Sequence, residues 1–209
     1  MKKERIIFDL DGTLLTSNPS LEREYFQSIY NDRASILLDQ LGDLLDTYEN
    51  FFPKYDVDLL AHYLSEKTGL NISPKVVSEW IHIIAYVPDT MEEGVMDTLE
   101  HLKSHNKSLA VLTNWFSITQ HTRLKRAGLY DFFDQIYTGE QFLKPLKKSY
   151  YTAIGIYHPD DCLFVGDSVN RDYIGPRACG MESILYDKND IEHQSIKKIK
   201  RMNELKNIL

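Results

Sequence analysis

Two aspartates follow a short apolar run near the N-terminus, and carboxylates in this position could take part in catalysis or bind a cation. Residues 5–8 are apolar and β-branched or aromatic after the first position, which is typical of a buried strand, and Asp9-Leu10-Asp11-Gly12-Thr13 comes directly after them. Side chains two apart on a strand project to the same face, so we expect the carboxylates of Asp9 and Asp11 to crowd each other. Two such anions need a cation or a shared proton. A plain surface turn is the alternative, because Asp-x-Asp-Gly turns are common.

More polar side chains follow the other strands that the sequence predicts. In a parallel sheet the carboxyl ends of the strands meet along one edge, so these side chains are expected to converge. They are Thr113, Asn114, Asp167 and, shortly after that strand, Asp172, with Lys144 before a helix in the same layer. Hard oxygen ligands suit Mg²⁺ rather than zinc. A carboxylate beside such a metal can attack phosphorus, and a second carboxylate can carry the proton.

Alternating helices and strands after residue 88 indicate what would position these residues. Strands are expected at 108–112, 135–138, 162–165 and 183–186, and helices at 91–102, 117–127, 146–157, 172–179 and the C-terminus. A capping box of Thr90 and Glu93 is expected to start the first of these helices, and Ser117 to cap the second. This order predicts an α/β fold with a Rossmann-like, doubly wound parallel sheet.

Residues 16–87 have a different character, with apolar residues at helical spacing and no strand alternation. Inserted directly after the first strand, this all-helical segment is long enough to cover the carboxyl end of that strand. We therefore expect residues 1–15 and 88–209 to form the catalytic core and residues 16–87 to form a cap. Val87-Pro88-Asp89 is expected to be the return hinge.

Composition limits the partners. The 209 residues carry a formal net charge of −7, with a pI near 5.5, which argues against nucleic acid or an anionic membrane. No targeting or membrane-spanning segment is visible, and the two cysteines are expected to be reduced, so a cytoplasmic location is the default. The insert has few arginines and several acidic residues, so a large polyanion is not expected as substrate. The oligomeric state is not readable.

The chain resembles the haloacid dehalogenase-like hydrolases over nearly its whole length. Four segments carry the resemblance in order and spacing: Asp9-Leu10-Asp11-Gly12-Thr13, Leu112-Thr113-Asn114, Lys144-Pro145, and Gly166-Asp167-Ser168-Val169-Asn170-Arg171-Asp172. Each is weak alone, and together they are specific. The resemblance implies a Rossmann-like core with a helical cap inserted between the first two segments.

The resemblance also implies catalytic roles. Asp9 would be the nucleophile that forms an aspartyl-phosphate, and Asp11 would be the acid that protonates the leaving oxygen and then the base that activates water. Thr113 and the backbone of Asn114 would hold the phosphoryl oxygens, and Lys144 would balance their charge. Lysines at 147 and 148 follow closely, but Lys144 is preferred by position, and the other two are expected to be solvated.

A Mg²⁺ ion is implied in the same way. Asp167 would bind it together with Asp9 and the main-chain carbonyl of Asp11, and Asp172 would be a ligand or a support for one. The pair His101 and His105 has the spacing of metal ligands, but no third ligand accompanies it, so a solvated helix end is expected there.

Asp11 narrows the reaction. Family members that cleave carbon–halogen bonds typically lack this second aspartate, so a phosphomonoester hydrolase acting on a sugar phosphate or nucleotide is favoured. A sugar-phosphate mutase would use the same residues and differ mainly in how its cap excludes water. A haloacid dehalogenase and a catalytically silent binding module on the same fold are the remaining alternatives.

Overall fold

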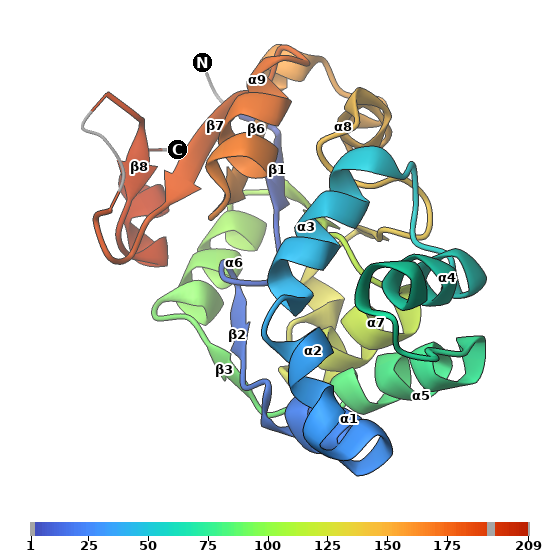
Figure 1. Cartoon of the computed structure of the whole chain (residues 1–209). Helices are drawn as coiled ribbons and strands as arrows, with labels where there is room; N and C mark the ends of the chain where they lie inside the picture. The colour runs from blue at the N-terminus through green and yellow to red at the C-terminus, as the bar shows by residue number, and fades with distance from the viewer. Residues whose placement is uncertain (1–2, 192–194, 209) are drawn as a thin grey trace.

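A computed structural model (Figure 1) describes residues 3–191 and 195–208. It contains a six-stranded sheet. All neighbouring strands run parallel, in the order β5-β4-β1-β6-β7-β8. The strands are β1 (Arg5–Phe8), β4 (Ser108–Leu112), β5 (Gln135–Tyr137), β6 (Cys162–Gly166), β7 (Glu182–Tyr186) and β8 (Lys198–Ile199). The expected α/β class and parallel sheet are confirmed.

The first strand, β1, lies in the middle of this sheet, between β4 and β6, and every residue in it is buried. Ile6 and Phe8 pack on one face with α6 (Val95–Ser104), α7 (Ser117–Arg126) and the 3₁₀ helix η5 (Met202–Asn207). Ile7 packs on the other face with α8 (Lys147–Ile154) and with Cys179 and Met181, which follow the short helix α9 (Gly175–Arg177). A strand covered on both sides is apolar at consecutive positions, which is the pattern that residues 6–8 show.

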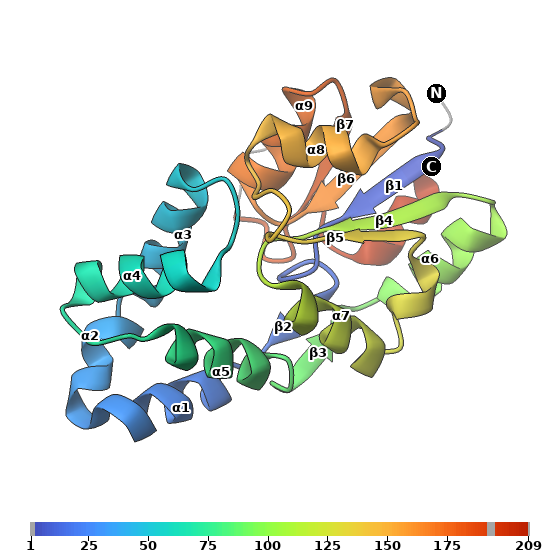
Figure 2. The ribbon, with the colours of Figure 1, turned by 90° about the vertical axis from the view of Figure 1, so that its right-hand side faces the viewer.

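Five helices from the segment between β1 and β4 lie at the carboxyl end of the sheet (Figure 2). They are α1 (Ser20–Tyr30), α2 (Ser35–Leu38), α3 (Leu41–Phe51), α4 (Val57–Thr68) and α5 (Pro74–Ile84), with a 3₁₀ turn, η1 (Asn31–Ala34), after α1. Their apolar faces form a separate cluster that also takes in Trp115, Phe116 and Leu143. The helical insert therefore rests on the loops that follow the strands.

A two-stranded antiparallel ribbon connects the insert to the sheet, and the sequence analysis did not predict it. β2 (Leu15–Ser17) pairs with β3 (Asp89–Met91). Because Met91 belongs to this ribbon, the next helix begins only at Val95, after Gly94 with φ of 80°. The expected capping box of Thr90 and Glu93 is therefore wrong. Of the expected return hinge, Asp89 belongs to β3, and Val87 and Pro88 precede it.

Other local expectations also needed correction. Ser117 is the first residue of α7 and makes no side-chain cap; its N–H donates to Glu140 instead, at 2.6 Å. The expected helix at 172–179 is a π-helical segment, η4 (Val169–Ile174), followed by α9. In place of a polar C-terminal helix, β8 and η5 add an edge strand and a 3₁₀ turn; residues 192–194 and 209 lie outside the described part of the chain. Within the described residues, no helix has the length and apolarity to cross a membrane.

Candidate active site

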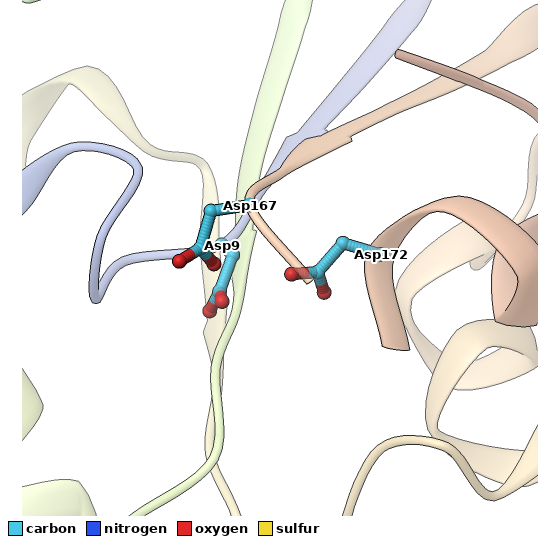
Figure 3. A group of neighbouring side chains, drawn as sticks. All are labelled: Asp9, Asp167 and Asp172. Carbon is cyan, nitrogen blue, oxygen red and sulfur yellow. The ribbon is translucent and has the colours of Figure 1, made fainter. Parts of the chain in front are cut away.

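Three carboxylates meet at the carboxyl end of the central strands. Asp9 directly follows β1, Asp167 directly follows β6, and Asp172 reaches back from η4 (Figure 3). One oxygen from each lies within 4.8 Å of the others. Asp9 and Asp172 are buried, whereas Asp167 faces solvent at the edge of a cavity. The sheet therefore brings together three of the four expected carboxylates.

A buried lysine neutralises part of this charge. The Nζ atom of Lys144 is 2.7 Å from Oδ1 of Asp172 and 3.0 Å from Oδ1 of Asp9, and the side chain is 2% exposed. Burial alone would lower the pKa of Lys144, but Asp172 and Asp9 outweigh it and raise that pKa. Lys147 and Lys148 are exposed, as expected. Lys144 is thus the lysine that the fold places in the cluster.

Two glycines leave room for the carboxylates. Gly12 has φ of 73°, and a Cβ atom there would lie 2.2 Å from Oδ2 of Asp167. At Gly166 an added Cβ would lie 2.5 Å or less from the Asp172 side chain. Real atoms do not approach so closely, so a larger residue at either position would displace a carboxylate.

The carboxylate of Asp11 is not part of the three-carboxylate group. Its Oδ1 accepts a hydrogen bond from Arg123 Nη1 at 2.6 Å, and its Oδ2 accepts one from Gln120 Nε2 at 2.8 Å. Arg123 also donates to both carboxylate oxygens of Asp89 in β3. The expected crowding of Asp9 and Asp11 is therefore relieved, because an arginine from α7 compensates Asp11 separately.

Thr113 and Asn114 shape the same edge after β4. The Thr113 hydroxyl donates to the carbonyl of Asn114 at 3.0 Å and accepts from Gln120 Nε2 at 3.0 Å. The Asn114 side chain bonds both backbone polar groups of Lys144, accepting from its N–H at 2.9 Å and donating to its carbonyl at 3.2 Å. Asn114 thus holds the backbone of Lys144 in place.

A cavity of about 460 Å³ lies between these residues and the helical insert. The core side presents Asp9, Asp11, Thr113, Asn114, Lys144 and Asp167, so all the expected site residues except Asp172 line it. The insert contributes Glu22, Glu49, Tyr55 and Trp80. A volume of this size accommodates a small metabolite.

The carboxylate cluster fits a hard divalent cation. Burial raises the pKa of Asp9 well above its ordinary value, against the opposing charge of Lys144. Partial burial, with the Asp172 charge, raises the pKa of Asp167 to about 6. Three carboxylates against one lysine leave negative charge at the site that Lys144 does not compensate. All the donors are oxygens, the set that Mg²⁺ prefers.

Sequence reasoning missed several polar residues of the site. Gln120 and Arg123 are three apart on α7 and fully buried, and Glu49 of α3 pairs with Arg171 of η4 at 3.1 Å. The sequence held one signal for Gln120 and Arg123: they are polar residues three apart on a helix, so they lie on the same face of it. Glu49 and Glu22 gave no such signal, since only tertiary packing brings the insert over the sheet.

Comparison with known proteins agrees with this geometry. A family model for haloacid dehalogenase-like hydrolases matches residues 4–180. A ribulose-1,5-bisphosphate 5-phosphatase of Halopiger xanaduensis is 26% identical over 88% of this chain and 85% of its own length. A pyrimidine 5′-nucleotidase of Escherichia coli is 31% identical over 87% and 84%, and a glyceraldehyde 3-phosphate phosphatase of Methanothermobacter thermautotrophicus is 30% identical over 86% and 84%.

Solved structures share the fold. A HAD-hydrolase from Bacillus subtilis bound to magnesium superposes with a TM-score of 0.75 at 21% identity, covering 100% of this chain and 99% of that one. An L-2-haloacid dehalogenase from Xanthobacter autotrophicus gives 0.73 at 15% identity, with 99% and 98% covered. These similarities establish the architecture of the sheet with its helical insert.

Proposed function

We propose, since the chain belongs to the haloacid dehalogenase-like hydrolase family, that it is a Mg²⁺-dependent phosphatase for small phosphorylated metabolites such as sugar phosphates or nucleotides. The observation that carries the proposal is the meeting of Asp9, Asp167 and Asp172 with buried Lys144, beside a cavity that Asp11 also lines. The named activities of three relatives, all of them phosphatases or nucleotidases, support the same reaction.

Asp9 is the proposed nucleophile. Its Oδ1 accepts a hydrogen bond from the N–H of Leu10 at 2.7 Å and lies 3.0 Å from Lys144 Nζ, so the carboxylate is held in one orientation. Attack on phosphorus forms an aspartyl-phosphate and releases the alcohol. Thr113, the backbone of Asn114 and Lys144 would hold the phosphoryl oxygens, and all three residues line the cavity at this edge.

Asp11 is the proposed acid and base. As the carboxylic acid it would give its proton to the leaving oxygen, and as the resulting carboxylate it would then take a proton from the attacking water. For both steps the hydrogen bond from Arg123 must be exchanged for one with the substrate or the water. Arg123 keeps its contacts with Asp89 and Gln120 in that exchange, so it remains paired when Asp11 leaves.

Asp9, Asp167 and the main-chain carbonyl of Asp11 would hold the Mg²⁺ ion. When bound, it would neutralise charge on the phosphoryl group. Asp172 supports Lys144 in this proposal, because its Oδ1 accepts from Lys144 Nζ at 2.7 Å and its Oδ2 accepts from the N–H of Ser168 at 3.0 Å.

The proposal includes the domain division and the location. Residues 1–15 and 88–209 would form the core and residues 16–87 the cap, which the separate apolar cluster of the insert supports. A cytoplasmic location fits the two cysteines, Cys162 and Cys179, which are free and buried.

The test is phosphate release from p-nitrophenyl phosphate, ribulose 5-phosphate and uridine 5′-monophosphate, with Mg²⁺ and with excess chelator. Turnover that needs Mg²⁺ is expected with at least one of them. No turnover, together with activation by a sugar bisphosphate, would indicate a mutase. Halide release from 2-chloropropionate without metal would indicate a dehalogenase. Complete inactivity of a folded protein toward all substrates would favour a binding module.

A further inference from the structure

The charges around the cavity restrict what the substrate can carry besides its reacting phosphate. Five carboxylates line the cavity: Asp9, Asp11, Glu22, Glu49 and Asp167. Among the described residues, its cationic side chains are Arg123, Lys144 and Arg171. One divalent cation would bring the sum of these formal charges to zero before the substrate is counted. The cavity would therefore have no surplus positive charge to offer a second anionic group in addition to the phosphoryl group.

Each of the three cations already has two acidic partners. Arg123 pairs with Asp11 and Asp89, and Lys144 with Asp9 and Asp172. Arg171 is the one of these three cations that pairs with helix α3 of the insert, so it is the cation that a second phosphate on the leaving group would have to bind. Asp46 and Glu49 of α3 pair with it, at 2.6 and 3.1 Å.

Glu49 makes Arg171 costly to release. Glu49 is buried, and its Oε1 accepts a hydrogen bond from the hydroxyl of Tyr55 at 2.7 Å, so the carboxylate is fixed from two sides. A substrate anion that took Arg171 would leave Glu49 buried without its cation, which is strongly unfavourable. Arg171 is therefore a contact between the insert and the core rather than an anion receptor.

Glu22 is the acid on the insert side that pairs with none of the three cations of the cavity lining. Within the described parts of the chain it makes no ion pair; its Oε2 accepts a hydrogen bond from Trp80 Nε1 at 2.8 Å. The charge of the next residue, Arg23, acts on Glu22, but Arg23 is exposed and does not line the cavity. The Trp80 ring packs edge-on against Trp115, with centroids 4.8 Å apart, and Trp115 directly follows Asn114. This chain of contacts fixes the Glu22 carboxylate relative to the strand end where the phosphate would lie.

We infer that Glu22 is a specificity-determining residue that excludes leaving groups with a second anionic group and accepts uncharged, hydroxyl-rich alcohols. This inference rests on the proposed phosphatase function and names its substrate class. A second phosphate on the leaving group would meet the Glu22 carboxylate, and each of the three cations of the cavity lining is already paired with two carboxylates. Sugar or ribose hydroxyls can instead donate to the Glu22 oxygens that Trp80 leaves open. The substrate would then be a sugar monophosphate or a nucleoside monophosphate, unlike the bisphosphate in the name of the Halopiger relative.

The experiment compares kcat/KM for ribulose 5-phosphate, uridine 5′-monophosphate and ribulose 1,5-bisphosphate at saturating free Mg²⁺. In the wild-type protein, kcat/KM for the better of the two monophosphates should exceed kcat/KM for the bisphosphate by roughly tenfold or more. That factor is the effect of one like charge about 10 Å away at an effective dielectric constant of about 20. In the Glu22→Gln protein the ratio of these two kcat/KM values should be about tenfold smaller, because the amide keeps the hydrogen bond from Trp80 but carries no charge. Glu24→Gln, on the exposed side of α1, is the matched control and should keep the wild-type ratio.

A second measurement needs no variant. Ribulose 1,5-bisphosphate should inhibit wild-type hydrolysis of p-nitrophenyl phosphate about tenfold more weakly than the better monophosphate. If p-nitrophenyl phosphate is cleaved but the bisphosphate is the better substrate or inhibitor, the inference fails and the phosphatase proposal stands. Equal ratios for Glu22→Gln and Glu24→Gln would also overturn it. Absence of any Mg²⁺-dependent turnover would overturn the phosphatase proposal itself.

Discussion

Replacing Lys144 with methionine should destabilise the protein strongly, whatever its substrate. The side chain is buried, and its Nζ atom lies 2.7 Å from Asp172 and 3.0 Å from Asp9. Methionine fills similar space but leaves two buried carboxylates without their cation. Breaking a buried pair in this way costs about 3–5 kcal/mol of the free energy of unfolding. For a chain of this length, that corresponds to a fall in Tm of roughly 6–20 °C.

Urea unfolding at pH 7 in the presence of a chelator measures this cost, because a bound divalent cation would otherwise offset the missing charge. Lys147→Met is the control, since Lys147 is exposed on the same segment and should change the free energy of unfolding by about 0.5 kcal/mol or less. Adding Asp172→Asn to Lys144→Met should restore at least about 1 kcal/mol by removing one stranded charge. A Lys144→Met protein within about 1 kcal/mol of wild type would refute the claim that this lysine neutralises the cluster.

Three further predictions follow from the site and its supports. Asp9→Asn should fold normally by circular dichroism and lose at least roughly a thousandfold in kcat toward p-nitrophenyl phosphate, because an amide cannot attack phosphorus; substantial turnover would exclude the covalent role. Asp167→Ala should weaken the apparent affinity for Mg²⁺ in calorimetry by at least about tenfold, and unchanged affinity would remove Asp167 from the metal site. Burial raises the pKa of Glu92, but hydrogen bonds led by that from Lys188 outweigh this effect and lower the pKa below its ordinary 4.5. Glu92 therefore stabilises the fold above pH 4.5, and the destabilisation by Glu92→Gln should shrink as the pH falls below that value; a deficit independent of pH would contradict this.

Local patterns in the sequence were sufficient for five of the six strands of the sheet, β1, β4, β5, β6 and β7, and for their order along the chain. Residues 6–8 are apolar at consecutive positions because both faces of β1 are covered, and that pattern is visible without a structure. The strand ends then locate Asp9, Thr113 and Asp167 on one edge, because parallel strands share their direction. The expected meeting of Asp9 with Asp167 and Asp172 follows from this rule, and the structure shows it.

Strands that form only by pairing with a segment far away in the sequence could not be predicted from local sequence patterns. The residues of β2 and β3 are about seventy positions apart, and neither has the length or alternation of an independent strand. At the C-terminus, β8 exists because it adds to the edge of β7, whereas its lysine-rich sequence taken alone suggested a solvated helix. Secondary structure that forms only through tertiary contact leaves little local signal.

The sequence by itself determined which carboxylates and which hydroxyl stand at the ends of the parallel strands, with a lysine before a helix in the same layer, because strand polarity and periodicity are local properties of the chain. Only the tertiary structure decided that Arg123 would bind the Asp11 carboxylate and that Glu22 would line the insert side of the cavity without an ion pair to its lining cations. Those contacts join segments about 110 residues apart, in the case of Asp11 and Arg123, or depend on how the helical insert packs over the sheet. Their energies come from burial and charge pairing between surfaces that meet only after folding, so no spacing along the chain encodes them.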